Sequence, residues 1–82
     1  IELYPNPVIA GQMFSLTFNR QINSSPSVVE IVNTNGEVLK NYALKSAFEK
    51  TKIEAPKQSG MYYVLVKNNR KQILAIKRIV VI

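Results

Sequence analysis

Residues 27–43 read SVVEIVNTNGEVLKNYA and contain the strongest fold signal of the chain. Two runs rich in β-branched and aromatic residues, Ser27–Asn33 and Glu37–Ala43, flank the pair Asn35-Gly36. This pair is typical of tight turns between antiparallel strands, because both residues tolerate positive φ angles. The stretch therefore predicts a β-hairpin.

The register of this hairpin depends on the length of its loop. A two-residue loop would place the apolar Ile31 opposite the charged Lys40, whereas a three-residue loop ending at Gly36 places Ile31 opposite Leu39. The longer loop also sets Glu30 opposite Lys40, a favourable cross-strand pair. We therefore predict the three-residue loop. It assigns to the outer face, together with Glu30 and Lys40, the side chains of Val28, Val32, Val38 and Tyr42.

Outside the hairpin, short apolar runs alternate with turn residues about every eight to twelve positions, which is typical of a sandwich or barrel. In residues 13–19, Phe14, Leu16 and Phe18 alternate with polar residues, which predicts a strand with one wet face. Further strands are predicted at Ile1–Tyr4, Thr51–Ala55 with Ile53 inward, Met61–Lys67 and Gln72–Ile82. The fold class is thus all-β, an immunoglobulin-like antiparallel sandwich of about seven strands.

Two of these segments need comment. The run Met61–Lys67 is nearly continuous in apolar residues, so we expect it to be a central strand covered on both faces. The stretch Ala43–Lys50 is compatible with a loop or with a single helical turn.

The composition argues against an enzyme. The 82 residues include no Cys, His, Trp or Asp, so the usual metal ligands, calcium-loop residues and the common catalytic base are missing. We expect no catalytic, metal or cofactor-binding residue. The net charge of +6 comes from dispersed Lys and Arg, which favours a solvated basic surface over nucleic-acid binding. No apolar run approaches the length that direct membrane insertion by a helix requires.

The end of the last strand is unusual. Residues 79–82 are Ile-Val-Val-Ile, which present apolar side chains to both faces, although a strand with one wet face should alternate. Either both faces are covered within the domain, or the outward side chains dock into a partner. If they dock, strand addition at the sheet edge is one possible mode.

Four sequence blocks occur in an order that resembles a known family. They are Tyr4-Pro5-Asn6-Pro7, the segment VEIVNTNGEVL at 29–39, the segment SGMYYVLV at 59–66, and the segment KRIVVI at 77–82. Together they resemble the type A C-terminal sorting domain of type IX secretion in Bacteroidota. The resemblance covers residues 3–82, and its main departure is Arg78, where many members carry Lys.

The resemblance implies that residues 1–82 are a single C-terminal sorting domain with its cargo domain upstream. Such a domain addresses exported cargo, which has reached the periplasm, to an outer-membrane translocon for attachment at the cell surface. The implied partners are the type IX translocon, an outer-membrane shuttle protein and a sortase-like peptidase that often removes the domain. The predicted recognition residues are Lys77, Arg78, Ile79, Val80, Val81 and Ile82.

A second set of residues is predicted to be structural. Tyr62 follows the Ser59-Gly60 turn as the corner tyrosine of immunoglobulin-like folds does, and the two prolines at positions 5 and 7 form a stiff elbow. Direct recognition of this elbow is the alternative to a structural role. The structural set comprises Tyr4, Pro5, Asn6, Pro7, Gly36, Gly60 and Tyr62.

Other functions are compatible with the same fold. The chain could be a retained interaction or signalling module at the outer membrane, or a spacer or carbohydrate-binding domain of a surface enzyme. A carbohydrate platform needs exposed aromatic residues, and most of those in this chain are expected in the core or in turns.

Overall fold

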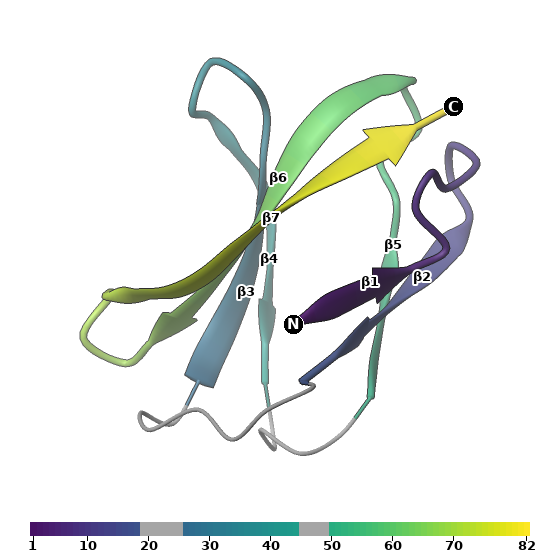
Figure 1. Cartoon of the computed structure of the whole chain (residues 1–82). Helices are drawn as coiled ribbons and strands as arrows, with labels where there is room; N and C mark the ends of the chain where they lie inside the picture. Colours follow the sequence, from purple (N-terminus) through teal and green to yellow (C-terminus); the bar gives the residue numbers. More distant parts are fainter. Residues whose placement is uncertain (19–25, 45–49) are drawn as a thin grey trace.

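The computed structural model describes residues 1–18, 26–44 and 50–82, which form two antiparallel sheets packed face to face (Figure 1). The first sheet has the order β1-β2-β5, formed by Glu2–Tyr4, Met13–Thr17 and Thr51–Glu54. The second has the order β4-β3-β6-β7, formed by Val38–Ala43, Pro26–Val32, Gly60–Asn68 and Ile73–Val81. The prediction of an all-β sandwich is confirmed. The segment predicted as a loop or helical turn falls mainly on residues 45–49, outside the described ranges.

The core lies between the two sheets and follows the two-residue period of the strands. In β2, Phe14 and Leu16 are almost fully buried, and Phe18 packs against the core, as the alternation predicts. Ile53 of β5 is also buried, as expected. The remaining core side chains come mainly from the four-stranded sheet and are those of Val8, Val29, Ile31, Ala55, Tyr62, Val64, Val66, Ile79 and Val81.

The hairpin between β3 and β4 has the predicted loop. The Asn33 amide donates a hydrogen bond to the Glu37 carbonyl over 3.0 Å, and Gly36 adopts a φ of 87°, so three residues form the loop. The Asn33 side-chain oxygen accepts hydrogen bonds from the backbone amides of Asn35 and Glu37, both over 2.9 Å. These two hydrogen bonds stabilise the turn.

The predicted register of the same hairpin is wrong. Val32 pairs with Val38, but the next pair is Ile31 with Lys40, so Leu39 forms a bulge. Glu30 consequently faces Asn41 rather than Lys40.

The bulge also changes the face to which the later residues of β4 belong. Tyr42 lies opposite the buried Val29 and packs against the core, although it was predicted on the outer face. Lys40 reaches across the open side of the sandwich to Glu54 of β5, with its Nζ 3.2 Å from the carboxylate.

The strand β6 is central, as predicted, because it pairs with β3 and β7. It is covered on one face only, which corrects the expectation of two covered faces. Tyr62, Val64 and Val66 are buried between the sheets, whereas Met61 on the other face is 39% exposed. The outer face of the four-stranded sheet is therefore an open surface that carries apolar side chains.

Candidate functional site

The last strand, β7, divides the predicted recognition segment into two sets of side chains. Ile79 lies opposite the buried Tyr62, and both Ile79 and Val81 are buried in the core. Lys77 and Arg78 are exposed, Val80 is 37% exposed, and Ile82 is 62% exposed. Since buried side chains cannot contact a partner, only the second set is available for docking to the folded domain. Arg78, Val80 and Ile82 lie on the open outer face, whereas Lys77 is opposite the buried Val64 and is exposed on the other face of the strand.

The outer edge of β7 is already paired near the C-terminal end. The chain segment after the second proline runs parallel to β7, with Val8 opposite Val81. The Val8 amide donates to the Val80 carbonyl, the Ile82 amide donates to the Val8 carbonyl, and the Ala10 amide donates to the Ile82 carbonyl, each over 2.9 Å. In Figure 1 the N-terminal chain accordingly passes beside the C-terminal end.

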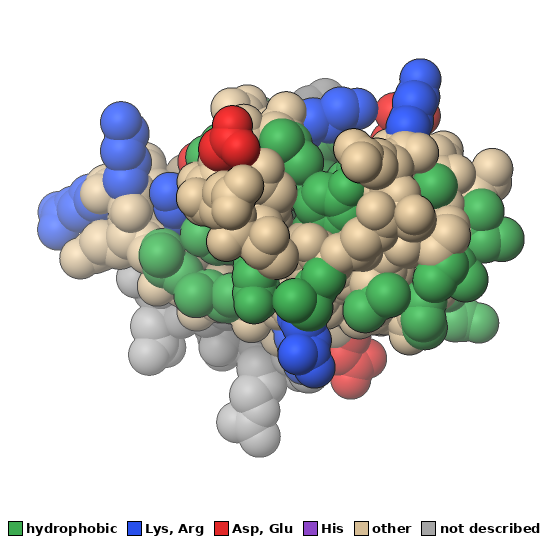
Figure 2. Space-filling model, turned by 90° about the horizontal axis from the view of Figure 1, so that it is seen from above, with side chains coloured by type: hydrophobic (Ala, Val, Ile, Leu, Met, Phe, Trp, Pro, Cys, Tyr) green, Lys and Arg blue, Asp and Glu red, His purple; other side chains and the backbone are tan. Residues whose placement is uncertain are grey.

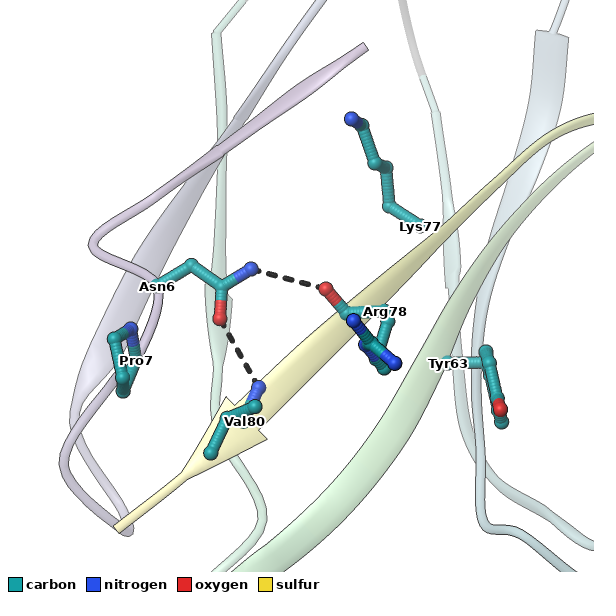
Figure 3. A pocket seen from close by; sticks show the side chains of 6 residues that line it. All are labelled: Asn6, Pro7, Tyr63, Lys77, Arg78 and Val80. Carbon is teal, nitrogen blue, oxygen red and sulfur yellow. Dashed lines mark hydrogen bonds between the residues drawn. The ribbon is translucent and has the colours of Figure 1, made fainter.

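Asn6 continues this pairing with its side chain. Its Nδ2 donates to the Arg78 carbonyl over 2.9 Å, and its Oδ1 accepts a hydrogen bond from the Val80 amide over 3.0 Å (Figure 3). A carboxamide carries one acceptor and a donor, as a peptide group does, so Asn6 replaces a neighbouring strand at this point. We call Asn6 with these two hydrogen bonds the edge clamp.

The edge clamp and the segment after it have two consequences. First, strand addition along residues 80–82 is not open to this fold, because the amide and carbonyl groups of Val80 and Ile82, together with the Arg78 carbonyl, already have partners. Second, Asn6 joins the Tyr4–Pro7 elbow to β7, a contact that the predicted structural role of the elbow requires. Pro5 and Pro7 have no amide hydrogen to donate, and the Asn6 side chain between them makes the two hydrogen bonds to β7.

Three other residues of the predicted structural set, Tyr62, Gly60 and Tyr4, lie near the ends of strands. The Tyr62 hydroxyl donates to the Gln58 carbonyl over 2.7 Å, which is the corner interaction expected of a tyrosine after this turn. Gly60 has a φ of 152°, a conformation that side chains rarely adopt, although a Cβ there would meet only ordinary contacts with the Tyr62 ring. Tyr4 is 70% exposed and contributes little to the core.

The charges near the terminal strand are unevenly paired. On the outer face of the four-stranded sheet, the Lys67 Nζ lies 2.9 Å from Glu30 Oε1, close enough for an ion pair although the geometry is not that of a hydrogen bond. Within the described ranges, by contrast, no carboxylate lies within ion-pair distance of Lys77 or Arg78. These two cations therefore contribute positive potential beside the exposed end of β7.

A pocket of about 480 Å³ opens beside the edge clamp (Figure 3). Two strands and the proline elbow contribute to its walls. Its lining residues are Asn6, Pro7, Tyr63, Lys77, Arg78 and Val80. None of these described lining residues is acidic, so the pocket combines two cations with an aromatic ring and aliphatic surface. Figure 2 shows how hydrophobic side chains reach the surface in a band along one side of the molecule, next to single Lys and Arg side chains.

Comparison with models of known protein families gives a match over nearly the whole chain. A family model described as a secretion system C-terminal sorting domain matches residues 2–82. The chain belongs to this family. The domain is therefore a C-terminal sorting signal of type IX secretion, a signal for export across the outer membrane to the cell surface or the extracellular space. No significant match exists among curated proteins.

In this sorting domain, the predicted recognition segment and the proline elbow lie at opposite ends of the sequence, and the fold brings them together. Arg78 and Asn6 are 72 positions apart in the chain and share a hydrogen bond. The pairing of the elbow with β7 is not apparent from the sequence. The signal that could have indicated it is an asparagine between two residues that lack amide donors. Within the described residues, no helix is long and apolar enough to span a membrane.

Proposed function

We propose that the type IX translocon and its outer-membrane shuttle protein recognise the exposed side chains at the end of β7. These are Lys77, Arg78, Val80 and Ile82, a subset of the six residues predicted from the sequence. The observation that supports this proposal is the exposure of apolar side chains on a strand whose edge is occupied. Because the strand edge is already paired, the exposed side chains are the part of this segment that a partner can contact.

Ile79 and Val81 have a different part in this proposal. They anchor β7 in the core and fix the direction in which their neighbours Arg78, Val80 and Ile82 project. A partner that binds a rigid strand avoids the entropic cost of ordering a flexible tail. Recognition therefore depends on the folded domain and not on the six terminal residues as a linear peptide.

The finer steps of the route are part of the same proposal. The cargo reaches the outer membrane through the periplasm, and a sortase-like peptidase cuts the chain upstream of this domain and attaches the cargo to the surface. We assign that chemistry wholly to the peptidase and none of it to this chain. The alternative is retention of the domain on the exported protein. Mass spectrometry of the surface form decides between them, since a retained domain leaves peptides of residues 1–82 on the cargo.

The test uses a surface substitution, because deletion of residues 78–82 would also remove Ile79 and Val81 from the core. The change Val80→Gln makes the open face polar at one position. Its matched control is Val38→Gln, since Val38 is 50% exposed on β4, the far edge strand of the same sheet. Each variant is fused behind a reporter and expressed in a bacterium with a type IX system, and the surface and periplasmic amounts of reporter are measured.

We expect Val80→Gln to reduce the surface reporter about tenfold, as loss of a central interface contact does. Val38→Gln should leave export within about twofold of the parent. Urea unfolding of both purified variants should stay within about 0.5 kcal/mol of the parent, because both positions are at the surface. Normal export of Val80→Gln, or equal loss in both variants, would contradict the proposal.

A further inference from the structure

The two cations at the end of β7 differ from others whose partners are defined by the fold. Lys40 pairs with Glu54, and Lys67 pairs with Glu30. Lys77 and Arg78 both line the pocket beside the edge clamp, and no carboxylate of the described residues is within ion-pair distance of either. As far as the described residues go, the local charge is thus positive and uncompensated, in a chain whose net charge is +6.

The shape of the site suits an extended group carrying a negative charge. The pocket of about 480 Å³ is bounded on one side by Asn6 and Pro7 and on the other by Tyr63 of β6. Tyr63 lies opposite Arg78 in the sheet, so both side chains project from the outer face. A guanidinium held on a strand beside an aromatic ring is well placed to bind a carboxylate, because its planar donors match two carboxylate oxygens.

Apolar surface continues from this pocket along the outer face. Val80 lines the pocket and lies opposite Met61, while Ile76 is 55% exposed on the same face of β7. A free phosphate group would satisfy the cations but would leave this apolar surface in water. A protein segment can cover both parts, since it can place an acidic side chain next to apolar ones.

We infer that this site binds an acidic protein segment, with a carboxylate at Arg78 and an apolar side chain over Val80 and Met61, while Lys77 on the opposite face of β7 adds positive potential. The inference rests on the proposed function, since it specifies the chemistry of the partner that recognises the end of β7. Long-range attraction between the basic domain and an acidic partner also speeds their encounter.

A charge series at Arg78 tests the inference in the export assay. We expect Arg78→Glu to lower the surface reporter at least tenfold, since it places like charges in contact, and Arg78→Lys to stay within about threefold of the parent. The control Arg70→Glu makes the same change of net charge on the exposed β6–β7 turn and should stay within about twofold. Equal export from Arg78→Glu and Arg70→Glu would overturn the inference.

A photo-cross-link identifies the class of partner. The probe is p-benzoylphenylalanine in place of Tyr63, an aromatic replacement within the pocket lining, with the same probe at Asn69 as the control position. In exporting cells, we expect a protein adduct at position 63 whose cross-linked peptide contains Asp or Glu beside apolar residues. The adduct should fall about tenfold when Arg78→Glu is added. A lipid adduct, a peptide without acidic residues, or no adduct during normal export would overturn the inference.

The two assays separate failure of this inference from failure of the proposed function. If Val80→Gln blocks export while Arg78→Glu does not, a partner recognises the end of β7 but does not bind it through an acidic group. If neither change affects export, the recognition surface itself lies elsewhere. Thermal unfolding of each purified variant confirms that lost export does not reflect a lost fold.

Discussion

Replacing Asn6 with alanine removes both hydrogen bonds of the edge clamp. The Arg78 carbonyl loses its donor at 2.9 Å, and the Val80 amide loses its acceptor at 3.0 Å. Each hydrogen bond contributes about 1 kcal/mol net, and water can reach this exposed site and replace part of the loss. We therefore expect Asn6→Ala to lower the free energy of unfolding by about 1–2 kcal/mol. For a domain of this size, the melting temperature should fall by roughly 5–15 °C.

Urea unfolding measures this loss, and Asn69→Ala provides the control. Asn69 is exposed on the β6–β7 turn, and its side chain makes no hydrogen bond to the described residues, so its replacement should cost less than about 0.5 kcal/mol. Hydrogen exchange locates the effect, because the Val80 amide should exchange at least about tenfold faster in Asn6→Ala. Equal stability of the two variants, with unchanged exchange at Val80, would refute the role assigned to the clamp.

Three further changes test the packing that presents the site. Tyr62→Phe removes the hydroxyl that donates to the Gln58 carbonyl over 2.7 Å, and urea unfolding should show a loss of about 1 kcal/mol. Lys71→Gly should stabilise the domain by up to about 1 kcal/mol, because Lys71 has a φ of 63°; a lower melting temperature would contradict this. Ile79→Ala should cost about 2–5 kcal/mol and Ile76→Ala under about 1 kcal/mol, since Ile79 is fully buried and Ile76 is 55% exposed; similar losses would show that β7 does not face the core as described.

Local chemistry explains which predictions from the sequence are confirmed. The alternation of Phe14, Leu16 and Phe18 marks a buried face because side chains of a strand alternate between its two faces. The three-residue hairpin loop follows from Gly36, which reaches a positive φ without strain. The Tyr62 corner also depends on residues close in sequence, since its hydroxyl reaches back four positions to Gln58.

The errors in the predicted register arise from interactions beyond the hairpin. The match between Ile31 and Leu39 looks favourable when the two strands are considered alone. In the folded domain, a bulge at Leu39 lets Tyr42 pack against the core and brings Lys40 to Glu54 on another sheet. A bulge costs little local pairing, so contacts with residues distant in sequence decide whether it forms.

By itself, the sequence determined the strands, the hairpin loop and the corner tyrosine, because these depend on side-chain periodicity and turn chemistry within a few residues. The tertiary structure decided which side chains of residues 77–82 are exposed, and it joined Asn6 to Arg78 and Val80. Burial and edge pairing are set by where the two sheets and the ends of the chain meet. Those relations between distant residues leave no periodic trace in the local sequence.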